Sequence, residues 1–454
     1  MIEKFLKRQE LFNPIGEQDV SHVDICMLLD VSDVLPIFLE QYSDNPPHNC
    51  LNPEAWIRLA YFRELENYRY LRELDKKLIT EPIIWMKLGF ESRPKYQTIC
   101  LALNKRMSDA CKVSLKKQAR YGMIEAGEKV NIRFGQSITQ DSTPISVSDR
   151  DTDGSFNPHY KSRILKANIL TDTNHKLELE VQVFGGTEYD GHHSFEMISE
   201  VEDSVPEDAL LWGDNHYSSA PAWAIFSTMT KYDLRFSISD SYALTIDDAE
   251  YALKHEYQRY YKEENFQVTL DYDEMARYLA DRYGWEYMRG IEQINSAYRL
   301  ERLEKRLRQK ISNKKRLLKK ALEEENYVKI RQLEELIAEL ETRCSKIKAS
   351  GEENRKTGEE KKTQSEKPLK IVGEYYKSQA KEDRMKTSSP NMRVLSESKN
   401  SELKRKGGVS GILAKGICKT QARFDVKLSL KFLIVRQRIL YGYTDRLGNM
   451  FRIA

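Results

Sequence analysis

The apolar residues of this chain change their spacing twice, and this change limits the folds that the chain can adopt. Between residues 130 and 244, apolar and polar residues alternate in short runs, which is the pattern of half-buried β-strands. On both sides of this segment, apolar residues recur every three or four positions, as they do on one face of a helix. The spacing therefore predicts an α/β protein in which a mixed sheet is flanked by helices.

Short runs bounded by turn residues are expected to form the strands. They lie at residues 130–135, 137–140, 164–170, 177–184, 210–213 and 234–238. A short helix is expected from Ser194 to Val201. Two longer helices are expected over Ala55–Leu78, after an Asn52-Pro53 start signal, and over Tyr96–Lys117.

Composition divides the chain into five segments. They are a helical N-terminal region at 1–125, the first part of an α/β core at 126–245, a helical insertion at 246–348, a linker at 349–390, and the second part of the core at 391–454. The insertion is expected to end in a coiled-coil hairpin that bends near residues 323–326. The linker is polar and rich in Ser, Lys and Glu, which predicts disorder. A strongly apolar helix is expected over Phe424–Tyr441.

Charge is distributed unevenly along the chain. Residues 391–454 contain 14 Lys and Arg against 4 Asp and Glu, whereas the whole chain has a net charge of +3. A tail this basic favours contact with a polyanion, with a solvated basic surface as an equal alternative. The chain has neither a run of 18 apolar residues nor a signal pattern in its first 20 residues. We therefore expect a cytoplasmic protein with no membrane segment.

Two aspartates stand where expected strands end. Asp141 follows Ser137-Ile-Thr-Gln140, and Asp214 follows Leu210-Leu-Trp-Gly213. Acids at the carboxyl ends of neighbouring strands face the crevice in which open α/β sheets bind ligands, and their oxygens are suitable ligands for a divalent cation. Each aspartate taken alone also fits an ordinary turn.

A third carboxylate lies between two cations at helical spacing. Arg393 and Glu397 are four residues apart, and Lys404 follows Glu397 by seven residues, so a helix would place all three side chains on one face. One metal-binding carboxylate between two phosphate-binding cations suits an enzyme that cuts a phosphodiester backbone.

This order of motifs resembles insertion-sequence transposases of the DDE class, which are built on an RNase H-like fold and have the helical signature Y-x2-R-x3-E-x6-K. Arg393, Glu397 and Lys404 match the signature, while Pro390 stands at the tyrosine position. Further similar stretches are Leu74–Leu78 with Leu88–Pro94, Asp141–Ile145, His159–Lys161 with Asp172, Gly185–Asp190 and Asp214–Tyr217.

The resemblance implies a transposase whose residues Asp141, Asp214 and Glu397 bind two Mg²⁺ (or Mn²⁺) ions and catalyse DNA strand cleavage and strand transfer. Arg393 and Lys404 would bind DNA phosphates. The partners implied are double-stranded DNA, as transposon ends and target, and further copies of the chain in a homo-oligomer. The helical N-terminal region would help to recognise the transposon ends, and the protein would be nucleoid-associated in a prokaryotic cytoplasm.

Three alternatives stay open at this point. Glu292, in a looser copy of the signature with Arg289 and Arg299, competes with Glu397 as the third carboxylate. The chain could also be an inactive DNA-binding protein of transposase descent, or a metal-dependent nuclease without strand transfer. The run at 149–154 matches the opening of a calcium-binding EF-hand loop, but Tyr160 stands where a glutamate is required, so a solvated loop is expected.

Overall fold

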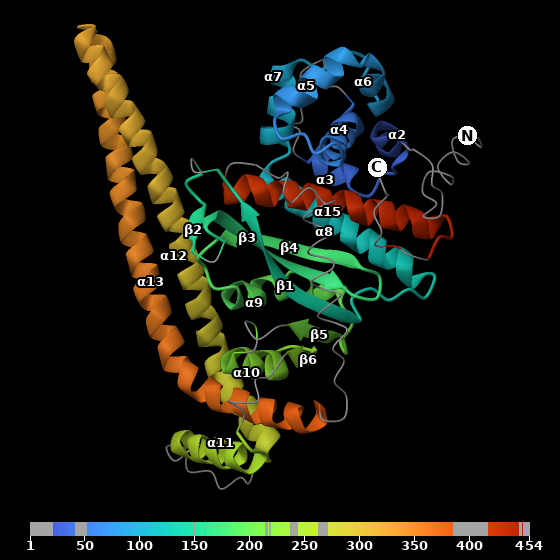
Figure 1. Ribbon diagram of the computed structural model, residues 1–454, viewed down its shortest axis with the longest axis vertical. Helices are drawn as coiled ribbons and strands as arrows, with labels where there is room; N and C mark the ends of the chain where they lie inside the picture. The colour runs from blue at the N-terminus through green and yellow to red at the C-terminus, as the bar shows by residue number, and fades with distance from the viewer. Residues whose placement is uncertain are drawn as a thin grey trace.

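The computed structural model describes residues 21–40, 52–148, 151–158, 160–213, 217, 219–236, 244–261, 271–384, 416–444 and 447. A mixed sheet lies in the middle of an elongated molecule (Figure 1). Short N-terminal helices cap one end of the molecule, and a long helical hairpin runs along one side. The α/β class and the helices that flank a mixed sheet are therefore confirmed.

Within the described residues, the sheet has six strands. They are β1 (Ser137–Ser146), β2 (Ser155–Asn157), β3 (Ser162–Asp172), β4 (Leu177–Gly185), β5 (Leu210–Gly213) and β6 (Asp233–Phe236). The strand order is β2-β3-β1-β5-β6, and β4 also pairs with β3. β1 is antiparallel to β3 and parallel to β5, and β5 is parallel to β6. The parallel strands are linked by α9 (Gly191–Ser199), η2 (Glu202–Ser204) and α10 (Ala220–Met229).

The strand expected at residues 130–135 is wrong, because the chain turns there. The backbone N–H of Ile132 donates to the carbonyl of Gly127 at 2.9 Å, which closes the end of the preceding helix. Asn131 and Gly135 both have positive φ angles, of 61° and 75°. Such residues reverse the chain direction and cannot belong to an extended strand. The other five expected strands are confirmed as β1, β3, β4, β5 and β6, as far as the described residues extend.

The N-terminal cap consists of short helices. They are α2 (His22–Leu28), α3 (Leu35–Leu39), α4 (Pro53–Leu65), α5 (Leu71–Thr80), α6 (Pro82–Leu88), α7 (Tyr96–Leu101) and the π-helical turn η1 (Ala102–Arg106). The start signal is confirmed, since the Asn52 side chain accepts from the backbone N–H of Glu54 at 3.0 Å. The long helix expected after it is interrupted at Asn67, whose φ of 55° ends α4.

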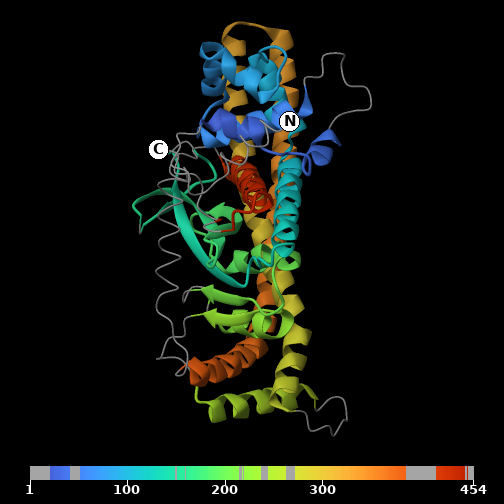
Figure 2. The ribbon, with the colours of Figure 1, turned by 90° about the vertical axis from the view of Figure 1, so that its right-hand side faces the viewer.

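The second long N-terminal helix is also interrupted. The Ser108 hydroxyl accepts a hydrogen bond from the backbone N–H of Cys111 at 3.1 Å, so Ser108 caps the new helix α8 (Asp109–Glu128). α8 lies beside α15 (Ile417–Leu440), and the two helices separate the N-terminal cap from the sheet (Figures 1 and 2). α15 confirms the expected apolar terminal helix.

Buried ion pairs join this helical layer to β4. Lys116 of α8 forms ion pairs with Glu180 of β4 and, at 3.0 Å, with Asp425 of α15. Lys431 of α15 pairs with Glu178. Burial lowers the pKa of Lys116, but the charges of Glu180 and Asp425 outweigh burial and raise it. The residues near the C-terminus therefore complete the same core that the central strands begin.

The insertion contains α11 (Ile246–Tyr261), α12 (Tyr272–Glu323) and α13 (Tyr327–Arg384). α12 and α13 are antiparallel and extend beyond the core as a hairpin (Figure 1). The expected bend near residues 323–326 is confirmed, and Glu325 has the positive φ of 52° that reverses the chain. None of the described helices combines the length and apolarity needed to cross a lipid bilayer.

The disordered linker expected at 349–390 is wrong, because α13 is helical through Arg384. Leu369, Val372 and Tyr375 of α13 are buried in a cluster with residues of α10, α11 and α12. Gly358 supports this packing, since a Cβ atom there would lie 2.7 Å from the carbonyl oxygen of Gly290 in α12. Polar composition indicated disorder, but long-range packing stabilises the helix. Residues 385–390 lie outside the described part of the chain.

Candidate functional site

The first predicted aspartate lies where β1 leaves its parallel neighbour. Gln140 of β1 is in register with Gly213, the last residue of β5. Asp141 is the next residue of β1 and is half-buried, with its Oδ1 accepting from the backbone N–H of Ser142 at 2.8 Å. On its other side β1 pairs with β3. The chain therefore continues from β1 to strands on one side of it and later returns to β5 on the opposite side. Such a topological switch point is where open α/β sheets form a ligand crevice.

Four of the predicted site residues lie outside the described residues. They are Asp214, Glu397, Arg393 and Lys404. Asp214 directly follows Gly213 in the sequence, and the strands that precede the two aspartates are neighbours, as expected. Only Asp141 of the three proposed catalytic residues lies in the described part of the chain, so their assignment stays a prediction.

A buried carboxylate contacts the residue after Asp141 and was not among the predicted site residues. Asp190, just before α9, accepts hydrogen bonds from the hydroxyl of Ser142 at 2.6 Å and from Lys166 Nζ of β3 at 2.6 Å. Asp190 is 7% exposed. A buried carboxylate with a cationic partner and a hydroxyl donor is fully engaged, so it holds the middle of β1 against β3 and the start of α9. The signal in the sequence was Lys166, a charged residue between Leu165 and Ala167 in an expected strand.

A second buried acid, Glu188, joins the sheet to the insertion. Glu188 accepts from the backbone N–H of Gly185 at 2.9 Å, lies 3.0 Å from His193 Nε2, and forms an ion pair with Arg302 of α12. Burial raises the pKa of Glu188, but the hydrogen bond with His193 and the charge of Arg302 outweigh burial and lower it. Glu188 is therefore a structural carboxylate that anchors α12 beside the candidate site.

α12 is held at this end of the sheet by further polar contacts. The side chain of Asn295 donates to the backbone carbonyl of His192 in α9 at 3.1 Å. Glu292, the alternative third carboxylate, is exposed and lies within one helical turn of Asn295. Arg299 pairs with Glu196 at 3.7 Å. The structure thus places Glu292 on a helix that packs near the site.

The described part of the EF-hand-like run, residues 151–154, is a buried anchor and not a solvated loop. Asp151 accepts from the backbone N–H of Gly416 at 2.9 Å, and Asp153 accepts from that of Ile417 at 2.9 Å. Asp153 also forms an ion pair with Arg306 of α12, with Nε 3.0 Å from Oδ1. Both acids are buried. The expectation of a solvated loop was wrong, because these acids cap the first turn of α15 and neutralise an arginine.

No cluster of three or more His, Cys, Asp or Glu side chains in the described residues is arranged to hold a metal ion. Two of the three predicted metal ligands, Asp214 and Glu397, lie outside that part of the chain. Comparisons with protein-family models, with curated proteins and with solved structures found no match to this chain.

Proposed function

We propose that this protein is a DDE transposase with an RNase H-like core, which cuts DNA strands and joins them to a target. The observation that carries the proposal is the register of β1 and β5. Gln140 and Gly213 are paired in parallel strands, and an aspartate directly follows each of them. Continued pairing would put the carboxylates of Asp141 and Asp214 side by side at the switch point of the sheet.

The residues at this position suit a divalent metal ion. Asp141 is a half-buried carboxylate whose surroundings hold it at the end of a central strand pair. Mg²⁺ and Mn²⁺ prefer such oxygen ligands. Asp141, Asp214 and Glu397 would bind the metal, which when bound polarises a phosphoryl oxygen and lowers the pKa of an attacking hydroxyl or water.

The remaining residues would position DNA and the carboxylates. Ser142 and Lys166 hold Asp190, and this contact fixes the backbone next to Asp141. Arg393 and Lys404 would neutralise phosphates on either side of the bond to be cut. Positioning of this kind matters because misplacement of a reacting group by about 1 Å lowers rates by roughly a hundredfold.

The test is strand cleavage by the Asp141→Asn and Asp214→Asn variants. Each substitution keeps the shape of the side chain but removes a metal-binding charge. The rate at which the protein cleaves the element's own terminal DNA in Mg²⁺ should therefore fall on the order of a thousandfold or more, which corresponds to a rise of several kcal/mol in the activation barrier. The matched control is Asp208→Asn, since Asp208 is exposed at the turn before β5. Cleavage by either catalytic-site variant at the wild-type rate would refute the proposal.

The same assay separates the two alternatives. A DNA-binding protein of transposase descent would retain DNA without metal-dependent cleavage, and Pro390 at the signature tyrosine favours this outcome. A nuclease would cut the strand and yield no joined product when target DNA is added. Joined products that require Mg²⁺ and both aspartates are the result expected of a transposase.

A further inference from the structure

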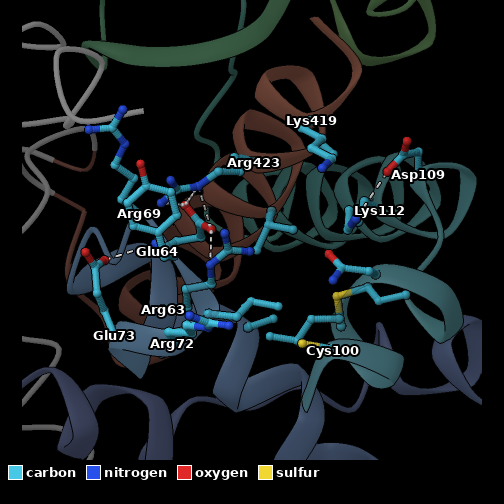
Figure 3. A pocket seen from close by; sticks show the side chains of 18 of the residues that line it. Arg63, Glu64, Arg69, Arg72, Glu73, Cys100, Asp109, Lys112, Lys419 and Arg423 are labelled. Atoms are coloured by element: carbon cyan, nitrogen blue, oxygen red, sulfur yellow. Dashed lines mark hydrogen bonds and ion pairs between the residues drawn. The ribbon is translucent and has the colours of Figure 1, made fainter. Parts of the chain in front are cut away.

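A large cleft lies between the N-terminal cap and the helical layer of α8 and α15, and the loop after β1 closes one side of it (Figure 3). Its volume is about 1010 Å³, and α4, α5, α7, α8 and α15 all contribute to its walls. Its basic lining residues are Arg63, Arg69, Arg72, Lys112, Lys419 and Arg423. Four acidic side chains also line it, which leaves a surplus of two positive charges.

The acidic residues of the cleft are already engaged. Asp151 accepts from the backbone at the start of α15, Asp109 pairs with Lys112 at 3.2 Å, and Glu73 accepts from the backbone N–H of Tyr70 at 3.0 Å. The fourth acid, Glu64, is buried and pairs with Arg423. The four acids therefore do not cancel the surplus of two positive charges in the cleft.

Glu64 has two guanidinium groups beside it. Arg423 Nε lies 3.1 Å and 3.0 Å from the two oxygens of Glu64, and Arg63 Nε lies 3.9 Å from the nearer one (Figure 3). Arg423 is 4% exposed. Burial and the charge of Arg423 lower the pKa of Arg63, which the charge of Glu64 partly offsets. A buried cation and a half-buried cation that share one carboxylate favour the approach of a further anion.

Several donors in the cleft lack an acceptor. Within the described part of the chain, Arg423 Nη1 and the Nε atoms of Arg63 and Arg69 are shielded from water and make no hydrogen bond. Buried donors are rarely left unsatisfied, and guanidinium groups with free N–H donors match the geometry of phosphate oxygens. An anion with several acceptor oxygens would satisfy these donors together.

We propose that this cleft binds a phosphate monoester dianion between α4 and α15. Two negative charges equal the positive surplus of the cleft, and three terminal oxygens provide acceptors for Arg63, Arg69 and Arg423. Arg72 and Lys419, both exposed, supply charge at the rim. The cleft is large enough for a nucleoside attached to the phosphate. This proposal goes beyond strand cleavage and stands whether or not the chain cuts DNA.

The phosphate has two chemically equivalent sources, a free nucleotide or the 5′-phosphorylated end of a DNA strand. The first measurement is calorimetric titration of the full-length protein with inorganic phosphate and with pyrophosphate, at an ionic strength matched with chloride. The second compares a 5′-phosphorylated oligonucleotide with the same oligonucleotide lacking that phosphate. A preference for the phosphorylated oligonucleotide assigns the site to a DNA end, and equal affinities together with binding of the free anions assign it to a soluble ligand.

Variants of the lining residues connect the binding to this cleft. Arg69→Gln and Arg72→Gln should each weaken binding of pyrophosphate by roughly fivefold or more, because each removes one charge-assisted contact. Arg423→Lys keeps a cation beside Glu64 and removes the Nη1 donor, so it tests the deepest contact without leaving a buried carboxylate unpaired. Arg93→Gln is the control, since Arg93 is exposed and pairs with Asp75 at 3.0 Å outside the cleft.

Two results would overturn the proposal. One is binding of phosphate and pyrophosphate no tighter than that of chloride. The other is wild-type affinity in Arg69→Gln, Arg72→Gln and Arg423→Lys when circular dichroism shows that they are folded. A lower thermal stability of Arg423→Lys does not alter this comparison, because Arg69 and Arg72 lie at half-exposed and exposed positions and report on the same cleft.

Discussion

Asp153 accepts a hydrogen bond of 2.9 Å from the backbone N–H of Ile417, although 264 positions separate the two residues in the sequence. The same carboxylate pairs with Arg306 of the insertion. One buried side chain therefore joins three segments: the loop after β1, the long hairpin and the start of α15. The insertion spans 139 residues from the start of α11 to the end of α13. The contacts of Asp153 explain how α15, which follows this insertion, packs into the core that the strands begin.

Asp153→Asn should destabilise the folded protein. The substitution keeps the size of the side chain but removes its charge, and it leaves Arg306 without its anionic partner. We expect a loss of about 2–4 kcal/mol in the free energy of unfolding, measured by urea denaturation. Asp208→Asn, at an exposed turn, should change the same quantity by no more than about 0.5 kcal/mol. Equal effects of the two variants would contradict the structural role of Asp153.

The lowered pKa of His192 predicts that the free energy of unfolding decreases in mild acid. Burial, and then the charge of Lys362, lower the pKa of His192 to about 4 from its ordinary value of 6.5. The unfolded chain therefore binds a proton between these two pH values while the folded chain does not. The stability is fully present above about pH 6.5 and is lost as the pH falls from 6.5 towards 4.

The His192→Gln variant removes this titration. The difference in free energy of unfolding between pH 7 and pH 4.5 should become smaller by about 2 kcal/mol in the variant. Denaturant titrations at the two pH values measure it. His255→Gln is the matched control, because His255 is exposed on α11, and it should leave the difference as in the wild type. An unchanged pH dependence in His192→Gln would show that other groups cause the acid effect.

Two glycines of α13 should respond in opposite directions to alanine. A Cβ at Gly373 would overlap the backbone carbonyl of Ala220 in α10, so Gly373→Ala should destabilise the protein by about 1–3 kcal/mol. A Cβ at Gly351 would meet Leu300 Cβ at an ordinary 3.5 Å, so Gly351→Ala should stabilise the helix by about 0.5–1 kcal/mol. Thermal unfolding of both variants measures the contrast. Destabilisation by Gly351→Ala would indicate that this segment is not a regular helix.

The sequence predicted the elements whose signals are local. Period-two alternation located five strands, and the aspartates that follow two of the expected strands indicated that β1 and β5 are neighbours. The Asn52 cap located the start of α4, and the break in apolar spacing located the bend of the hairpin. These features depend on residues within a few positions of one another, so the local sequence is enough to predict them.

The features that the sequence did not predict depend on distant partners. Asp153 looks solvated because Ile417 and Arg306 are far away in the chain. Gly358 looks like a linker residue because the backbone that requires a glycine there, that of Gly290, belongs to another helix. Asp190 and Glu188 look like turn residues until Lys166 and Arg302 are placed beside them. Pairings of this kind follow from the fold and not from local composition.

Glu397→Gln and Glu292→Gln should differ in their effect on DNA cleavage. Glu397 lies between Arg393 and Lys404 at the spacing of the transposase signature, whereas Glu292 is exposed on α12. If Glu397 is the third metal ligand, its replacement removes one charge from the metal site and cleavage in Mg²⁺ should fall on the order of a thousandfold. Glu292→Gln should cut DNA within about twofold of the wild-type rate, since replacing an exposed side chain leaves the fold intact. The reverse pattern would make Glu292 the third ligand and would retain the proposed class of enzyme. Loss of cleavage in neither variant, with Asp141→Asn inactive, would require a third carboxylate elsewhere in the chain.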